Sequence, residues 1–133
     1  MYKVLAVIAV TLITGLASSH GAYAYGAIAI GTNHGDSYGM TWNNPSQVLA
    51  NADALLQCNR RAKSSSACTI IGLVTKQCGA VAGTEARPAM PASYFGATGP
   101  KLATAKLNAL MGCMKTGAKC RVVVSGCDTA RQQ

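Results

Sequence analysis

The sequence predicts an α+β fold of two pseudo-repeats, with about five or six mostly antiparallel strands, two packed helices and disulfide staples. Three observations predict it. The chain begins with an export signal, all six cysteines follow that signal, and two helical segments recur at a constant offset. The chain after the signal is long enough for one domain rather than two.

The first 24 residues have the layout of a signal peptide. Lys3 supplies the positive start, residues 4–16 are mostly apolar, and residues 22–24 form a small-x-small cleavage site. The apolar run is about thirteen residues, shorter than the roughly 20 that a spanning helix needs. We therefore expect residues 1–24 to be cleaved off and residues 25–133 to form a single exported domain. This domain is expected in the periplasm or outside the cell, with no stable membrane insertion.

Each repeat is expected to contain a helix that runs from a proline to a cysteine. Asn44 is the predicted N-cap of the first helix, with Pro45 at its first position, and Pro100 opens the second helix. The offset is 55 residues between the two prolines and again between Cys58 and Cys113, which indicates an internal repeat. The predicted buried stripes, from helical spacing, are Val48, Leu49, Ala52, Leu55 and Leu56 in the first helix and Leu107, Leu110 and Met111 in the second.

Strands are expected on both sides of each helix. "YGAIAI" and "SYGMTW" flank the turn sequence "GTNHGD" and predict a hairpin, and "ASYFGAT" precedes the second helix. β-Branched runs follow the helices, and "CGAVAG" adds a further strand. The stretch that contains Pro88 and Pro91 reads as a connector. The repeats are therefore placed at about residues 25–83 and 92–127.

An even number of cysteines behind a signal peptide indicates disulfide bonds. Zinc is disfavoured, because no two cysteines have zinc-site spacing and His34 is the one histidine after the signal. We expect no metal and no cofactor. The six cysteines are Cys58, Cys68, Cys78, Cys113, Cys120 and Cys127.

The expected pairs are Cys58–Cys68, Cys113–Cys120 and Cys78–Cys127. In the first two, a short turn from helix to strand can bring the α-carbons to the roughly 5.5 Å that a bridge requires. The last two cysteines are then left at equivalent positions and are expected to bond across a pseudo-twofold axis. The alternative, Cys68–Cys78 with Cys120–Cys127, is disfavoured because the residues between would have to fold back as hairpins.

A family resemblance covers the same region. "YGAIAI", "YGMTW", "ADALLQC", "CGAVA" and the repeated "ALMGC" to "CRVVV" together resemble Domain of Unknown Function 4189, a family of small exported bacterial proteins. The resemblance implies an exported α+β domain with two pseudo-repeats. It supplies no catalytic residues.

Catalytic groups are sparse. His34, Asp36 and Ser37 are neighbours in one turn, whereas triad members come from separate parts of a fold, so the residues are interpreted as turn formers. Glycosidase chemistry needs two carboxylates across a cleft, and no pair is indicated. The carboxylates after the signal are Asp36, Asp53, Glu85 and Asp128. The chain is therefore predicted not to be an enzyme.

The formal net charge of +8, which falls to +7 without Lys3, favours anionic partners. Basic residues cluster after each helix, where they complement the helix dipole or form a contact surface for an anionic partner. Interleaved aromatic residues are missing, so no specific nucleic acid is expected. The residues of this candidate surface are Arg60, Arg61, Lys63, Lys115, Lys119 and Arg121.

The predicted function is a non-catalytic, exported, disulfide-bonded binding domain whose partner is an unknown protein or an anionic envelope polymer. An inhibitor or immunity protein in the cell envelope is one form of it, by analogy of size and location. The alternatives are a small envelope hydrolase that uses His34, or a structural envelope protein.

Overall fold

The computed structural model describes residues 24–62 and 67–128, so nearly all of the predicted signal peptide lies outside the described residues. The described part contains six strands and two helices. In chain order these are β1 (Tyr25–Gly31), β2 (Tyr38–Asn44), α1 (Gln47–Arg61), β3 (Cys68–Leu73), β4 (Cys78–Thr84), β5 (Tyr94–Gly99), α2 (Leu102–Met114) and β6 (Cys120–Cys127). Neither helix is long and apolar enough to cross a membrane.

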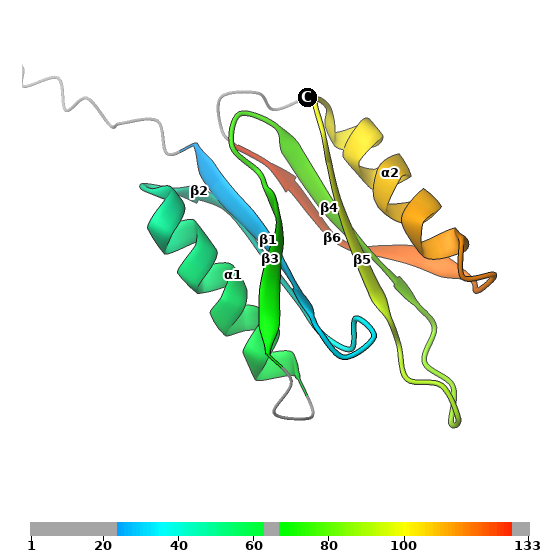
Figure 1. Cartoon of the computed structure of the whole chain (residues 1–133). Coiled ribbons are helices and arrows are strands. Elements are labelled where there is room, and N and C mark those ends of the chain that lie inside the picture. The colour runs from blue at the N-terminus through cyan, green and yellow to red at the C-terminus, as the bar shows by residue number, and fades with distance from the viewer. Residues whose placement is uncertain (1–23, 63–66, 129–133) are drawn as a thin grey trace, which may run out of the picture.

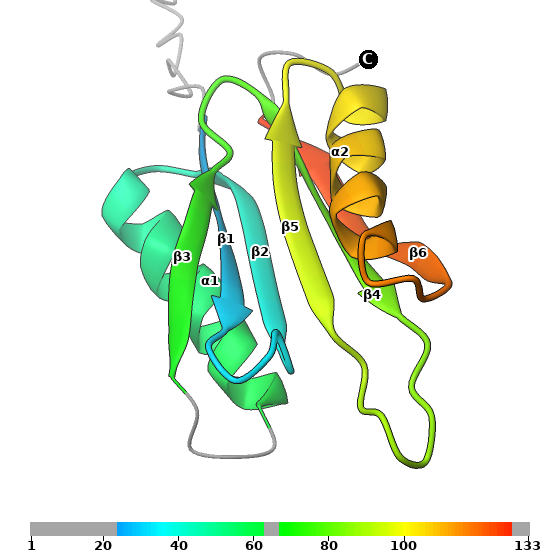
Figure 2. The same ribbon diagram turned by 45° about the vertical axis from the view of Figure 1, so that its right-hand side comes forward.

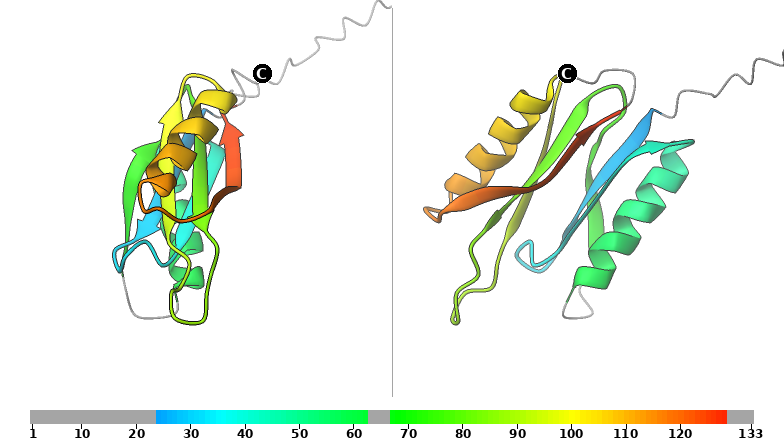
Figure 3. Two further views of the ribbon diagram at one scale, coloured as in Figure 1. Left: turned by 90° about the vertical axis from the view of Figure 1, so that its right-hand side faces the viewer. Right: turned by 180° about the vertical axis from the view of Figure 1, so that it is seen from behind.

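The strands form two three-stranded antiparallel sheets, ordered β2-β1-β3 and β5-β4-β6. Both sheets arise from the same chain order of two strands, one helix and one strand, with the first strand at the centre. The sheets lie face to face, and each helix covers the outer face of its own sheet (Figure 1). The view from behind shows the helices on opposite outer faces (Figure 3). The predicted α+β fold with two pseudo-repeats is confirmed.

Strand pairing places β4 in the second unit. The first repeat expected from the sequence, residues 25–83, includes this strand, but β4 pairs with β5 on one side and β6 on the other. By topology the units are therefore residues 25–73 and 78–127. The two central strands share a Gly-Ala-x-Ala pattern, residues 26–29 in β1 and 79–82 in β4.

The central strands alternate between two environments. In β1, Ala27 and Ala29 join the cluster beneath α1, whereas Ile28 points into the layer between the sheets. Val81 of β4 meets Ile28 in that middle layer, and all four of these residues are completely buried. The protein therefore has a branched apolar core between the sheets and an alanine-rich core under each helix.

Each helix turns small residues toward its sheet, so the predicted apolar stripes are wrong. Val48 is 78 % exposed and Leu107 is 55 % exposed. Of the predicted stripes, Leu55 and Leu110 pack partly against the cores. The buried residues are Ala50, Ala54 and Cys58 in α1 and Ala105, Ala109 and Cys113 in α2.

The reason is the short distance between helix and sheet. A Cβ atom placed at Gly39 of β2 would collide with the carbonyl oxygen of Ala54 and lie 2.7 Å from the amide nitrogen of Cys58. A leucine on this face of α1 has no room, so the larger apolar residues point outward. The helix start also differs from the prediction of an Asn44 cap. Ser46 is the N-cap, and its hydroxyl accepts a hydrogen bond from the Leu49 amide at 3.3 Å.

The disulfide bonds join Cys58 to Cys68, Cys113 to Cys120 and Cys78 to Cys127, and no cysteine is free. These are the pairs expected from the sequence. The first two each connect the end of a helix to the start of the following strand. The third joins directly opposed residues of β4 and β6, and so lies within the second sheet rather than across an axis between the units.

Candidate functional site

A groove of about 730 Å³ lies at one end of the molecule, where the two units meet. Its walls come from the β1–β2 turn and the end of α1 in the first unit, and from the β4–β5 connection in the second. Figure 2 shows the β1–β2 turn and the β4–β5 connection at the same end of the sheets. The lining residues are Asn33, Asp36, Tyr38, Arg61, Ala86, Arg87, Pro88, Pro91, Ala92 and Tyr94.

Two tyrosines from equivalent positions contact each other where the two units meet. Tyr38 is the first residue of β2 and Tyr94 the first residue of β5. Their ring centroids are 4.5 Å apart and the ring planes are tilted by 50°. The Tyr94 ring also packs over Gly83 of β4, where an added Cβ would lie 2.7 Å from the ring. The rings therefore have neighbours on the protein side, within a contact between the two units.

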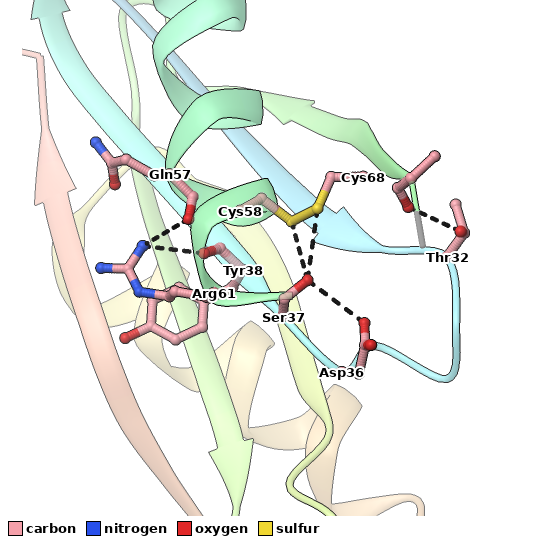
Figure 4. Close-up of a disulfide and its surroundings, with 9 residues drawn as sticks. Thr32, Asp36, Ser37, Tyr38, Gln57, Cys58, Arg61 and Cys68 are labelled. Carbon is pink, nitrogen blue, oxygen red and sulfur yellow. Dashed lines mark hydrogen bonds between the residues drawn. A yellow bond between two sulfur atoms is a disulfide. The ribbon is translucent and has the colours of Figure 1, made fainter. Parts of the chain in front are cut away.

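Arg61, in the last turn of α1, lies over the Tyr38 ring. Its guanidinium carbon is 4.6 Å from the centroid of the Tyr38 ring, within the range of a cation–π contact. Its Nη1 donates to the backbone oxygens of Tyr38 at 3.1 Å and Gln57 at 3.3 Å (Figure 4). These three contacts fix the plane of the guanidinium at the edge of the groove.

The β1–β2 turn links the first unit to β5. The Tyr94 amide donates to the Gly35 oxygen at 2.8 Å. Gly35 has φ of +69°, and a Cβ there would lie 2.8 Å from the Tyr94 oxygen, so only glycine fits without strain. His34 before it also has a positive φ, +54°, and its side chain is exposed. The turn is thus shaped by backbone requirements and holds one wall of the groove.

Ser37 does not offer a nucleophile to solvent. It is fully buried, and its hydroxyl lies 3.3 Å from Sγ of Cys58 and 3.4 Å from Sγ of Cys68 (Figure 4). The hydroxyl also donates to Asp36 Oδ1 at 3.4 Å. A hydroxyl packed against a disulfide cannot reach a substrate, so the His34, Asp36 and Ser37 cluster has no accessible serine.

The predicted basic residues are distributed over two regions. Arg60 and Arg61 end α1, whereas Lys115 and Lys119 follow α2 and Arg121 lies in β6; Lys63 lies outside the described residues. Of the described members, Arg61 alone lines the groove. Sequence reasoning missed Arg87. Arg87 lies in the β4–β5 connection, inside the second unit, and no spacing in the sequence relates it to the first unit.

The remaining carboxylates lie apart in the fold. Asp53 is exposed on α1, and Glu85 lines a smaller hollow of about 200 Å³ that shares Arg87 and Pro91 with the groove. Asp128 is buried, and its amide donates to the Gln77 oxygen at 3.3 Å. Within residues 24–62 and 67–128, no group of three or more His, Cys, Asp or Glu side chains is placed to hold a metal ion.

Comparison with known families gives one match. A family model described as a domain of unknown function, DUF4189, matches residues 25–127. This match covers both units and every residue that lines the groove. No curated protein and no solved structure matches the chain.

Proposed function

Because the chain belongs to the DUF4189 family, which is defined without a function, we propose its role from the structure. The protein is an exported, disulfide-bonded domain that binds a partner through the groove between its two units and catalyses no reaction. The partner is a protein or an anionic polymer of the cell envelope. Inhibition of an envelope enzyme is one such role.

The observation that carries the proposal is the groove itself. Its volume of about 730 Å³ falls within the range of ligand sites, and both units contribute to it. Two tyrosines and two arginines line it, and these residue types are enriched where proteins bind partners. The fixed guanidinium of Arg61 supports binding without a large loss of side-chain freedom.

Export is supported by two independent features. Three disulfide bonds indicate an oxidising environment. The signal-peptide layout of residues 1–24 supports a periplasmic or secreted location. A mass measurement on the exported protein tests this part of the proposal: we expect a chain that begins at Tyr25, and a chain that retains residues 1–24 would contradict it.

A capture experiment tests the binding role. Disulfide-bonded protein is immobilised and exposed to envelope extract from the native cell, beside variants Arg87→Gln and Arg60→Gln. Arg87 lines the groove, whereas Arg60 is an equally charged, exposed neighbour outside it. We expect the same partner to be retained by the wild-type protein and Arg60→Gln and lost by Arg87→Gln. Equal retention by both variants would refute binding at the groove.

A His34→Ala variant separates binding from the hydrolase alternative. His34 is exposed on the β1–β2 turn and is not among the residues that line the groove. We expect the variant to capture the partner as the wild-type protein does. An envelope hydrolase activity that is present in the wild-type protein and absent from this variant would establish the alternative.

A further inference from the structure

We propose that the groove recognises the carboxylates of an extended acidic peptide segment, with Arg61 and Arg87 as the binding cations and the hydroxyls of Tyr38 and Tyr94 as additional donors. This inference rests on the proposed function, because it names the ligand chemistry of the same groove. Its basis is a set of hydrogen-bond donors in the groove that have no partner among residues 24–62 and 67–128.

Arg61 offers a prepared edge for a carboxylate. A guanidinium has five N–H donors in a fixed plane, and the two on Nη1 point to the backbone oxygens of Tyr38 and Gln57. In the described part of the chain, no hydrogen bond uses Nε or Nη2. Figure 4 shows the second terminal nitrogen directed away from both carbonyl groups. The remaining edge presents parallel donors, which is the geometry that a carboxylate binds in bidentate fashion.

Arg87 supplies a second cation from the other unit. Its backbone amide and oxygen exchange hydrogen bonds of 2.9 and 3.0 Å with Met90, which closes a tight turn with Pro88 and Ala89 at its tip. The backbone is thus held while the side chain is exposed and lines the groove. Among the described residues, its guanidinium makes no hydrogen bond. The groove therefore has a cation on each wall.

The two tyrosines add donors rather than stacking surfaces. Arg61 lies over Tyr38, and Tyr94 packs against Gly83 and the Tyr38 ring. Sugars and nucleobases that bind aromatic residues need open ring faces, and this packing leaves mainly ring edges and hydroxyls for a ligand. Neither hydroxyl takes part in a hydrogen bond with the described residues. Hydroxyl donors beside guanidinium groups suit an acceptor with several oxygens.

Each wall of the groove carries one cation, so each wall can pair with one singly charged group of a ligand. Two arginines and one carboxylate, Asp36, line it, which gives a net charge of +1. Asp36 Oδ1 is turned toward the Ser37 hydroxyl and the backbone of Gly31, inside the turn. A carboxylate carries one charge and two coplanar oxygens, which match the two parallel donors of the Arg61 edge. Side-chain carboxylates along an extended peptide can reach both walls.

The test is a titration of the disulfide-bonded protein with a blocked hexapeptide of alternating glutamate and alanine, followed by NMR of the arginine Nε–H groups. The control ligands are the matching glutamine peptide and trigalacturonate. We expect the glutamate peptide to shift the Arg61 and Arg87 resonances. Arg87→Gln and Arg61→Lys should each weaken binding by about tenfold, roughly 1.4 kcal/mol, because each removes one carboxylate fork. Arg60→Gln should bind like the wild-type protein.

Five outcomes would overturn the inference. Equal weakening in Arg60→Gln would show attraction to general surface charge, and equal binding of the glutamine peptide would exclude carboxylate recognition. Tighter binding of trigalacturonate would assign the groove to an acidic sugar polymer. If the glutamate peptide fails to bind while Arg87→Gln still loses the captured partner, the carboxylate inference fails and the proposed function stands. Retention of that partner by Arg87→Gln would contradict both the carboxylate inference and the proposed binding at the groove.

Discussion

A methyl group at Gly39 would have no room between β2 and α1. The added Cβ would collide with the Ala54 oxygen and lie 2.7 Å from the Cys58 nitrogen, and both are backbone atoms of α1. Backbone atoms cannot rotate away as a side chain can, so the helix itself must move. Overpacking of a core costs typically 1–3 kcal/mol, and a contact with backbone belongs at the upper end. We therefore expect Gly39→Ala to lower the free energy of unfolding by about 3 kcal/mol.

Urea unfolding followed by circular dichroism measures this effect. In thermal unfolding of a domain of about 100 residues, the same loss of unfolding free energy lowers the midpoint temperature by roughly 12 °C. The matched control is Gly112→Ala in α2, where the nearest atom to the new Cβ is Phe95 Cβ at 3.9 Å. This variant should gain about 0.5–1 kcal/mol, because glycine weakens a helix interior relative to alanine. A Gly39→Ala protein as stable as the wild-type protein would refute the close approach of α1 to its sheet.

Three further predictions concern the bridges and the junction of the units. Replacing Cys78 and Cys127 by alanine opens a loop with a sequence separation of 49 and should cost about 4 kcal/mol, against about 2.5 kcal/mol for Cys113 and Cys120 with a separation of 7. Urea denaturation of the two double variants tests this order, and equal losses would contradict the chain-entropy argument. Alkylation of denatured, unreduced protein should label no cysteine; two or more labelled thiols would contradict the disulfide framework. Gly35→Ala should cost about 2 kcal/mol, because it combines an unfavourable φ with a contact to β5, and an unchanged unfolding midpoint would show that the turn is not tied to that strand.

Much of the fold could be predicted because its signals are local. A helix that ends in Cys58 and a strand that begins at Cys68 are joined by a short segment, so chain proximity alone favours their bond. The same holds for Cys113 and Cys120. The Cys78–Cys127 pair was expected for a different reason, an axis between the units, whereas β4 and β6 are neighbours in one sheet.

The boundary between the units could have been found in the sequence. Residues 26–29 and 79–82 share the pattern Gly-Ala-x-Ala, and both segments form the central strand of a sheet. Alignment of these segments places β4 at the start of the second unit. The predicted boundary instead follows the connector with Pro88 and Pro91. Prolines indicate a break in secondary structure, but they do not indicate whether the break separates two units or two strands.

The candidate site was only partly predictable. Arg61 was singled out with its neighbours after α1, but nothing in a run of cations indicates which one lies over a tyrosine ring. Arg87 and Tyr94 are distant in sequence from Tyr38 and share a groove with it because the sheets are stacked. A site assembled across two sheets leaves no spacing pattern in the chain.

The sequence by itself determined the order of strands and helices, the disulfide framework and the presence of two similar units, because these depend on neighbouring residues and on short connections. Only the tertiary structure decided which face of each helix is buried. Helical spacing selects leucine and valine, but Gly39 and the alanines of β1 bring the sheet so close to α1 that only Ala50, Ala54 and Cys58 fit beneath it. The size of a buried face depends on the surface opposite, and that surface comes from another part of the chain.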